Sequence, residues 1–279
     1  MFSSIKVAAI SLRPKKWDKP ANAAKMERLI RTAAAESPDV IVTIEGAFEG
    51  YVVYDVIEGR KSADEMLEIA EPLDGQYVAR FRQLAGLLRV CLCFGFAERV
   101  GNEIYNTVVF IDHTGEICGS YHKSQFAEGT HSSWNFNRIG KRLRAFDTPF
   151  GRAGVLICND RWNPLIARAI VLDGAQILYI PTYGNTSKAQ NQAVLARARE
   201  NGVPIVQANV GQNLAVNKGE MVAYQRGFDK ITHATVDIPA APSTTAARSL
   251  EQEYLTLQGP EMQRRYRETM AKLKEARVE

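Results

Sequence analysis

The chain has 279 residues, of which 46% are hydrophobic and 24% are charged, and its formal net charge is +4. This is the composition of an ordinary globular protein that is long enough to bury a sizeable core. Basic residues cluster only near the C-terminus, so the sequence does not favour nucleic-acid binding. The sequence contains no apolar run of about 18 residues, so it predicts no membrane span.

The N-terminal stretch, the cysteines and the histidines indicate the expected cellular compartment and whether a metal is bound. The short apolar run at the N-terminus is broken by Arg13 and Pro14, and it lacks the length and cleavage pattern of a signal peptide. The 4 cysteines do not make a disulfide framework in a chain of this length, and the 4 histidines are scattered without zinc-ligand spacing. We therefore expect a cytosolic protein with reduced thiols and without a metal or an organic cofactor.

The first third of the chain alternates strands and helices. The predicted elements are a strand over 5–12, a helix over 20–36, a strand over 39–45, a short helix from residue 62 and a helix over 75–89. Asp18 is the predicted cap of the first helix, with Pro20 in its first turn. Ser62 begins a Ser-Ala-Asp-Glu run with the capping-box pattern. The second strand ends in Glu45.

The middle of the chain changes to strands without helices. Three strand-like runs over 91–99, 104–112 and 116–123, separated by short turns, predict an antiparallel meander. Beyond it we expect a hairpin over 144–158, a helix near 163–173, a strand over 176–181, a helix over 188–201, and strands over 204–210 and 231–238. This order predicts an α/β protein with mixed sheets covered by helices.

The C-terminal segment differs in composition from the rest. Residues 239–249 have the composition of a loop, and residues 250–277 are helix-prone and charged, with Gly259-Pro260 as an expected break. We therefore predict one domain over 1–239 and a C-terminal extension over 240–279. The helix is interpreted either as a solvated tail or as a segment that packs on a second subunit.

Three polar residues follow apolar strand-like runs, where α/β folds place their chemistry: Glu45, Lys123 and Cys158. Each has an ordinary structural explanation when it is considered alone. A free cysteine is usually a small core residue, and a Glu or Lys after a strand is usually a cap or a surface residue.

Together the three residues form a coherent catalytic site. A cysteine attacks as its thiolate, so Cys158 needs a base, and Glu45 is suited to that role. Lys123 and the backbone N–H of Asn159 are candidates to stabilise the oxyanion. A Cys–His pair with His122 or His131 is the alternative, although neither histidine falls in a protease-like motif.

Five segments resemble, in the right order, motifs of the nitrilase or carbon–nitrogen hydrolase superfamily. They are VIVTIEGAFEGY at 40–51, GSYHKSQF at 119–126, GVLICNDRWNP at 154–164, GAQILYIPTY at 174–183 and ARARENGVPIVQAN at 196–209. The resemblance runs from the first strand to about residue 238. It implies an αββα sandwich, a Glu-Lys-Cys triad, a thioester intermediate and a homodimer or larger homo-oligomer.

The resemblance also assigns roles to residues. It implies that Glu45 is the general base, Lys123 stabilises the intermediate and Cys158 is the nucleophile. Many members have a second acid after the lysine motif, and Glu128 is the only acid between Lys123 and Asp147. Glu128 is therefore the candidate supporting acid.

The residues after the nucleophile bear on the substrate. Cys-Asn-Asp-Arg-Trp is similar to the Cys-Asn-Asp-Arg-Arg-Trp of N-carbamoyl-D-amino-acid amidohydrolases, in which an arginine helps to bind the substrate carboxylate. Arg161 is the corresponding candidate, with an internal salt bridge as the alternative. The sequence departs from that group at Gln125, where a histidine is usual, and at Trp162, which replaces the second arginine.

The expected function is hydrolysis of a small amide or N-carbamoyl compound through a thioester. Further candidates for substrate contacts are Tyr51, Tyr54, His131, Trp134, Thr182, Tyr183 and Asn185, although aromatic loop residues as often serve packing. One alternative is a nitrilase, although nitrilases usually carry Cys-Trp-Glu at the nucleophile. Another is an inactive interaction module that uses the C-terminal helix.

Overall fold

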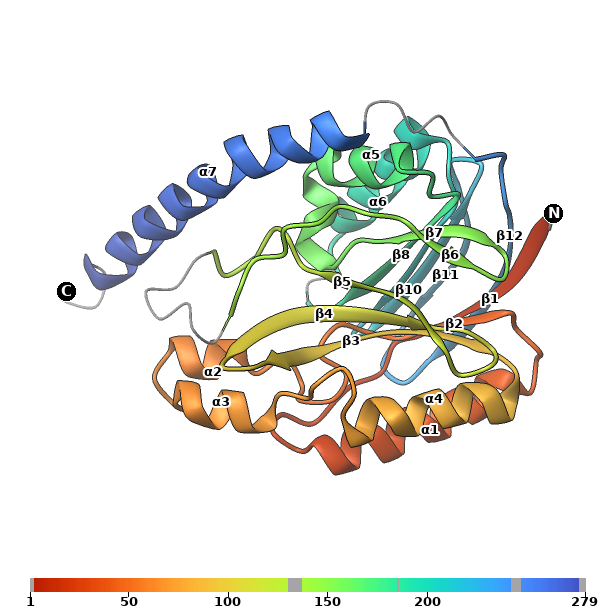
Figure 1. Cartoon of the computed structure of the whole chain (residues 1–279), viewed down its shortest axis with the longest axis horizontal. Coiled ribbons are helices and arrows are strands. Elements are labelled where there is room, and N and C mark those ends of the chain that lie inside the picture. The colour runs from red at the N-terminus through yellow and green to blue at the C-terminus, as the bar shows by residue number, and fades with distance from the viewer. Residues whose placement is uncertain (1–2, 130–136, 185, 242–246, 276–279) are drawn as a thin grey trace.

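Two six-stranded sheets lie face to face, and helices cover both outer faces (Figure 1). The computed structural model describes residues 3–129, 137–184, 186–241 and 247–275. The first sheet has the strand order β12-β1-β2-β3-β4-β5, and the second has the order β11-β10-β9-β8-β7-β6. Both sheets mix parallel and antiparallel pairs. The predicted αββα sandwich of the α/β class is confirmed.

The elements have the following bounds. The first sheet consists of β1 (Ser4–Ile10), β2 (Val40–Val42), β3 (Cys91–Val100), β4 (Glu103–Ile111), β5 (Ile117–His122) and β12 (Ile231–Asp237). The second consists of β6 (Phe146–Thr148), β7 (Gly151–Val155), β8 (Ile177–Thr182), β9 (Ile205–Asn209), β10 (Gln212–Asn217) and β11 (Glu220–Arg226). The helices are α1 (Lys19–Ala34), α2 (Val53–Ile57), α3 (Ala63–Ile69), α4 (Gln76–Leu88), the 3₁₀ helix η2 (Cys158–Trp162), α5 (Pro164–Leu172), α6 (Lys188–Asn201) and α7 (Ala247–Glu275).

The outer layers follow from strand periodicity and helix caps. Successive side chains of a strand point to opposite faces, so Ala8 and Ile10 pack with α1 and α4 while Val7 and Ala9 face the second sheet. The predicted caps are confirmed: Asp18 accepts from the backbone N–H of the first turn of α1, and Ser62 forms a reciprocal capping box at α3.

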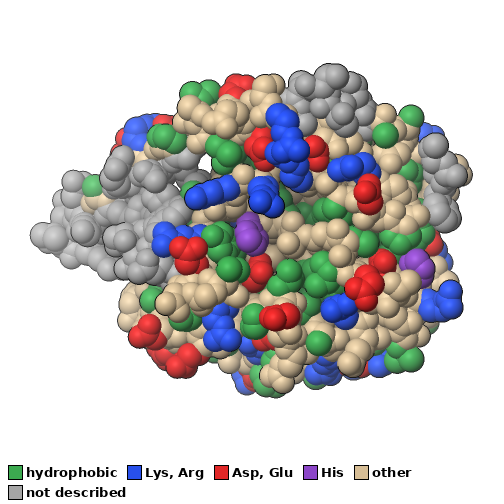
Figure 2. All heavy atoms as spheres, in the orientation of Figure 1, with side chains coloured by type: hydrophobic (Ala, Val, Ile, Leu, Met, Phe, Trp, Pro, Cys, Tyr) green, Lys and Arg blue, Asp and Glu red, His purple; other side chains and the backbone are tan. Residues whose placement is uncertain are grey.

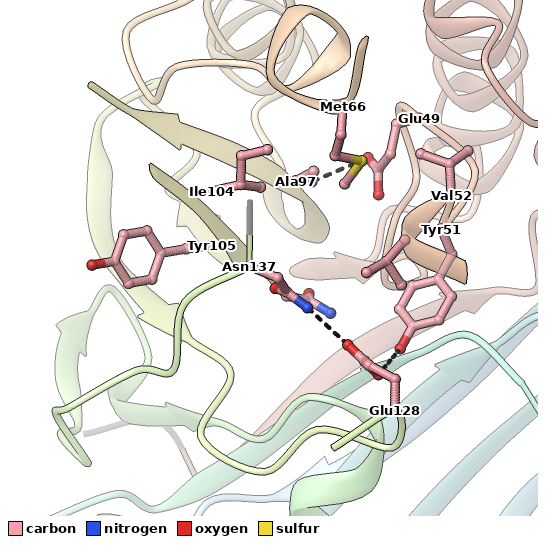
Figure 3. A pocket seen from close by; sticks show the side chains of 11 residues that line it. Glu49, Tyr51, Val52, Met66, Ala97, Ile104, Tyr105, Glu128 and Asn137 are labelled. Carbon is pink, nitrogen blue, oxygen red and sulfur yellow. Dashed lines mark hydrogen bonds between the residues drawn. The ribbon is translucent and has the colours of Figure 1, made fainter. Parts of the chain in front are cut away.

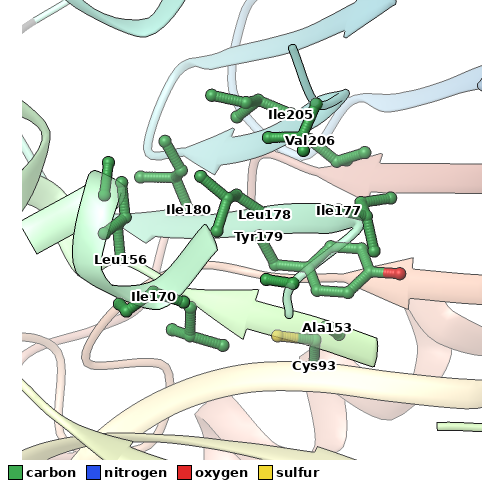
Figure 4. Packing of buried hydrophobic residues seen from close by; sticks show 14 of the residues in the cluster. Cys93, Ala153, Leu156, Ile170, Ile177, Leu178, Tyr179, Ile180, Ile205 and Val206 are labelled. Carbon is green, nitrogen blue, oxygen red and sulfur yellow. The ribbon is translucent and has the colours of Figure 1, made fainter. Parts of the chain in front are cut away.

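The core between the sheets is continuous with the contacts that hold α5. Figure 4 shows Cys93 on β3 close to Ala153 and Tyr179 of the second sheet, with Ile170 of α5 beside Leu156. Tyr179 also packs against Phe110 of β4, with ring centroids 5.5 Å apart. This packing fixes the two sheets relative to each other, and both carry catalytic candidates at their strand ends.

Several predicted elements need correction. The strand expected over 39–45 is regular only over Val40–Val42, although backbone hydrogen bonds to β3 continue from Thr43, Ile44 and Ala47. Residues 212–226 form the hairpin of β10 and β11, which was not predicted. Tyr54 lies in the short helix α2 and not in a loop.

The C-terminal helix also differs from expectation. α7 continues through Pro260, so the break expected at Gly259-Pro260 is wrong, although the proline removes one helical N–H. Its first turns pack against α5 of the same chain, and its C-terminal half projects beyond the sheets (Figure 1). Over the described residues, no helix combines the length and the apolar character needed to cross a membrane.

Candidate active site

Glu45 is placed by the close approach of its backbone to β3. The N–H of Gly95 donates to the carbonyl of Ile44 (3.0 Å), and a Cβ at position 95 would lie 2.8 Å from the Glu45 Cα. Only glycine permits this contact between the two segments. The Glu45 side chain is thereby held in the interior, where it is fully buried.

Lys123 forms the centre of the buried polar cluster. It follows the last residue of β5, and its backbone N–H donates to the carbonyl of Asn106 on β4 (2.8 Å). Its Nζ lies 2.7 Å from Oε1 of Glu45 and 3.4 Å from the hydroxyl of Tyr51. Both members of the Lys123–Glu45 ion pair have 0% exposed side chains.

Two further donors complete the environment of Glu45. Nδ2 of Asn106 donates to Oε1 (2.6 Å), and the backbone N–H of Tyr183 donates to Oε2 (2.9 Å). Burial acts to lower the pKa of the Lys123 ammonium, but the acidic groups around it, Glu45 first among them, outweigh burial and raise that pKa above its ordinary value. Lys123 is therefore a permanent positive charge in this site.

Cys158 begins η2, three residues after the end of the strand β7. Its φ angle is +48°, a left-handed conformation that is uncommon for a residue with a side chain. The thiol donates to the carbonyl of Tyr183, with a sulfur–oxygen distance of 3.9 Å. Such strained turns recur at functional sites, where they expose a reacting atom.

The Cys158 thiol is held in its protonated form. Its pKa lies at about 11 instead of 9.0, chiefly because the thiol is buried; Glu45 adds to the rise, while Lys123 and Arg161 oppose it. A thiol with this pKa carries its proton at neutral pH. Attack by its sulfur therefore requires that a base take the proton during the reaction, and Glu45 is the nearby carboxylate.

A cavity of about 310 Å³ opens beside Cys158. Its wall consists of Lys16, Tyr51, Tyr54, Ala127, Cys158, Asn159, Arg161, Tyr183, Gly184 and Gln190. The rings of Tyr51 and Tyr183 stack with centroids 5.0 Å apart and form one aromatic side of it. The cavity has the dimensions of a small-molecule site.

Glu128 reaches the lysine through a tyrosine. Its Oε2 accepts from the Tyr51 hydroxyl (3.0 Å), and its Oε1 accepts from Nδ2 of Asn137 (2.9 Å); Figure 3 shows both bonds. The Tyr51 hydroxyl is also the second partner of the Lys123 ammonium. A void of about 20 Å³ beside these groups has room for about one water molecule.

Arg161 is a buried cation without a buried acid beside it. Its side chain is among the largest fully buried ones, and Nη1 donates to Thr182 (3.2 Å) and Gln207 (3.3 Å). Nε of Arg161 and Nε2 of Gln207 have no hydrogen-bond partner, and no carboxylate of the described residues pairs with this guanidinium. Buried charges are normally paired, and this guanidinium borders the cavity without such a partner in the described part of the chain.

Asp160 connects the turn that carries Cys158 (residues 157–160) to the residues that carry and follow Lys123 (residues 123–125, the lysine segment). One carboxylate oxygen accepts from the N–H of Ile157 (2.9 Å) and the Tyr121 hydroxyl (2.9 Å). The other accepts from the N–H groups of Ser124 (3.3 Å) and Gln125 (2.7 Å). Burial raises the pKa of this carboxyl to about 6, against the effect of these donors.

The structure brings some of the predicted site residues together at the cavity and places others elsewhere. Glu45, Lys123 and Cys158 lie together, and Tyr51, Tyr54, Asn159, Arg161 and Tyr183 line the same cavity. Thr182 is fully buried behind Arg161 and is not part of the cavity wall. His131, Trp134 and Asn185 lie outside the described residues, so their predicted contacts remain predictions.

His122 lies at a different hollow from that of Cys158. Its Nε2 contacts Oε2 of Glu98 (2.9 Å), and its ring stacks on Tyr105 with centroids 4.2 Å apart. The hollow measures about 350 Å³ and is lined by Tyr105, Ser120, Tyr121, His122, Ile139, Lys141, Arg142 and Arg144. Figure 2 shows Lys, Arg and His side chains gathered on this face. These contacts give His122 a partner other than the nucleophile.

Sequence reasoning missed three residues that shape the site. Asn106 is a polar residue within the apolar run of β4, and that interruption was a usable signal. Asn137 holds Glu128, and Lys16 lines the cavity while it pairs with Asp55 (2.7 Å). Both lie in loops, where no periodicity marks a residue as facing a site.

The chain is similar to known proteins over most of its length. Residues 6–228 match the Carbon-nitrogen hydrolase family. An N-carbamoylputrescine amidase of Arabidopsis thaliana is 31% identical over 231 residues, covering 80% of this chain and 74% of the relative. A citrullinase of Francisella tularensis is 31% identical over 184 residues, covering 65% of this chain and 62% of the relative.

The fold has solved counterparts as well. The crystal structure of an amidase from Nesterenkonia sp. superposes with a TM-score of 0.72 at 20% identity, covering 92% of this chain and 98% of that one. The family match covers strands of both sheets, all except β12, and all three catalytic candidates. The chain belongs to the carbon–nitrogen hydrolase family, and it is an amidohydrolase-type enzyme of the nitrilase superfamily.

Proposed function

We propose that the enzyme hydrolyses a small amide or N-carbamoyl compound through a thioester on Cys158. The observation that carries the proposal is the position of this thiol, in a strained turn at a small-molecule cavity, next to the buried Lys123–Glu45 pair. The relatives named for N-carbamoylputrescine and citrulline both point to a carbamoyl group as a substrate feature.

In the first half of the reaction, Glu45 takes the thiol proton while the Cys158 sulfur attacks the carbonyl carbon. The oxyanion that forms is stabilised by the Lys123 ammonium and by the backbone N–H of Asn159, at the start of η2. The C–N bond then breaks, and Glu45 returns the proton to the leaving nitrogen. Ammonia or an amine departs, and the acyl group remains on sulfur as a thioester.

In the second half, Glu45 takes a proton from water, and the hydroxide attacks the thioester carbon. The C–S bond breaks, and the Cys158 sulfur regains its proton from Glu45. Glu128 acts at a distance: it accepts from Tyr51, whose hydroxyl oxygen accepts from the lysine. This arrangement holds the ammonium in position through both halves of the reaction.

The charge of the cavity favours a substrate with an anionic end. Among the described residues Arg161 has no acidic partner, while Lys16 pairs with Asp55, which also pairs with Arg60. A guanidinium matches a carboxylate bidentately. The site therefore suits an N-carbamoyl or amide substrate that carries a carboxylate, as citrulline does, better than one with a cationic end, such as N-carbamoylputrescine.

A parallel assay of ammonia release tests both parts. The wild type, Cys158→Ala and the matched control Cys118→Ala are each given N-carbamoyl amino acids, N-carbamoylputrescine, simple amides and nitriles. We expect turnover in the wild type and in Cys118→Ala, whose thiol is half-buried on β5, and none in Cys158→Ala. Turnover by Cys158→Ala would overturn the proposed nucleophile, and a preference for nitriles would favour the nitrilase alternative.

Arg161 is tested with the same substrates. In Arg161→Gln we expect KM for an N-carbamoyl amino acid to rise at least tenfold, because a charge-assisted hydrogen bond to a buried group is worth about 1.5–3 kcal/mol. KM for a neutral amide should change little. Equal losses for both substrates would show that Arg161 is structural.

Compartment and assembly also belong to the proposal. All 4 cysteines are free thiols, which supports a reducing compartment such as the cytosol. A homo-oligomer is supported by the projecting half of α7 and by the exposed apolar side chains Met221, Val222 and Tyr224 on the edge strand β11. Light scattering on the purified chain measures the assembly directly.

A further inference from the structure

The first turns of α7 belong to the folded core, although they lie beyond the residues that match the family. The family match ends at residue 228, whereas α7 begins at Ala247. Tyr254 is only 3% exposed and belongs to the buried cluster that also contains the residues of α5, and Leu250 and Leu255 pack against the same cluster. This part of the extension is therefore ordered by contacts with the catalytic domain.

Tyr254 reaches the segment that carries the catalytic lysine. Its hydroxyl donates to the backbone carbonyl of Ser124, the residue directly after Lys123. Ser124 is itself fully buried, so this carbonyl has no access to water. A buried carbonyl that loses its donor is destabilised, and the backbone around it shifts to find another.

A second contact anchors the same helix one turn earlier. Glu251 is nearly buried; its Oε1 accepts from the N–H of Leu143 (2.7 Å), and its Oε2 pairs with Arg144. Glu251 and Tyr254 are three residues apart, so they lie on the same face of α7. Together they fix the position of the helix relative to the lysine segment.

The backbone of Lys123 itself bonds to Asn106 and Gly140, and the residues after it are held from two further sides. Asp160, two residues after the nucleophile, accepts from the backbone N–H groups of Ser124 and Gln125, and Tyr254 donates to the carbonyl of Ser124. The Lys123 ammonium has no other anchor than Glu45 and the Tyr51 hydroxyl in the described part of the chain. Its location against Cys158 therefore depends on where its backbone is held.

We propose that α7 is a positioning element of the active site, in which the Tyr254 hydroxyl holds the Ser124 carbonyl and so keeps the Lys123 ammonium against Glu45 and Cys158. The inference rests on the proposed catalytic roles of Lys123 and Cys158. Tyr254 touches neither the substrate nor the reacting atoms, and it acts through the backbone of the lysine segment.

The test uses Tyr254→Phe with Tyr179→Phe as its matched control. Tyr179 is equally buried in the same core, but its hydroxyl makes no hydrogen bond within the described residues. Two readouts are measured well below the melting temperature of each variant: kcat and KM with the best substrate, and the rate of Cys158 alkylation by iodoacetamide at pH 9. The alkylation readout needs no substrate.

For Tyr254→Phe we expect kcat to fall about three- to tenfold at unchanged KM, equivalent to about 0.7–1.4 kcal/mol. Alkylation of Cys158 should slow by a similar factor, because a displaced Lys123 stabilises the thiolate less. Tyr179→Phe should leave both rates at the wild-type values. Glu251→Gln weakens the anchor one turn before Tyr254 and should lower kcat and the alkylation rate by a smaller factor. This second variant keeps the test informative if Tyr254→Phe does not fold.

Two outcomes separate this inference from the proposed function. If Tyr254→Phe and Glu251→Gln lower the melting temperature but leave both rates unchanged, α7 is only structural and the inference is overturned. If the wild type itself shows no turnover, and Cys158 is not the thiol that gives the measured alkylation, the proposed function has failed instead.

Discussion

The buried Lys123–Glu45 pair makes a strong prediction about stability. Lys123→Met removes the ammonium and leaves a fully buried carboxylate whose remaining donors are Asn106 and the N–H of Tyr183. Removing one partner of a buried pair costs about 3–5 kcal/mol. Because Glu45 keeps two hydrogen bonds, we expect the lower end, about 3 kcal/mol.

The double variant provides the internal check. Glu45→Gln combined with Lys123→Met replaces the orphaned carboxylate by a neutral amide, so it should recover at least half of the lost stability. Thermal unfolding and urea titration measure the change; for a chain of this size, about 3 kcal/mol corresponds to a melting temperature lower by roughly 6–12 °C. Lys15→Met, which removes an exposed lysine paired with Asp18, should move the midpoint little.

All variants that lack Lys123 or Glu45 should be inactive. The double variant should therefore regain stability without regaining turnover. If Lys123→Met is as stable as the wild type, or if the double variant is no more stable than Lys123→Met, the pair is not a buried charge pair. The electrostatic account of the site would then be wrong.

Two further predictions concern Glu45 and Cys158. Asn106→Ala removes the 2.6 Å hydrogen bond to Glu45 and should lower kcat about tenfold with little change in KM, whereas a change in KM alone would place Asn106 at the substrate. Folding raises the pKa of the Cys158 thiol from 9.0 to about 11, so the folded state keeps this proton longer than the unfolded chain does. The thiol's contribution to the free energy of unfolding is therefore present below about pH 9 and is lost as the pH rises towards about 11. Urea titrations of the wild type and Cys158→Ala between these pH values isolate this contribution. Parallel pH profiles of the two proteins would contradict the raised pKa.

The sequence predicted those parts of the fold that depend on local pattern. The helix caps at Asp18 and Ser62, the meander of β3 to β5 and the alternation of strands and helices follow from residue order alone. The hairpin of β10 and β11 was missed because its second strand alternates exposed and half-buried residues, which gives little apolar periodicity. A breaker signal at Gly259-Pro260 marks the loss of one helical hydrogen bond, and α7 continues past it.

The site residues also divide into those that a local sequence pattern marks and those that it does not. Glu45, Lys123 and Cys158 were identifiable because each stands after an apolar run within a motif, and the structure brings them together. Asn106 interrupts the apolar run of β4 and carried a signal that was not used, whereas Asn137 lies in a loop without periodicity. Tyr254 acts through a contact with a segment 130 residues away in the sequence, which no local pattern marks. Thr182, which was expected at the substrate, supports Arg161 from behind instead.

The central claim is that Cys158 carries the acyl group during turnover. The most direct measurement is rapid acid quenching during steady-state hydrolysis of the best substrate, followed by intact mass spectrometry and peptide mapping of the wild type. We predict an adduct with the mass of the acyl or carbamoyl moiety on the peptide that contains Cys158, absent in Cys158→Ala and lost when substrate is exhausted. Steady ammonia release without an adduct at any quench time, or with an adduct on Cys91, Cys93 or Cys118, would contradict it.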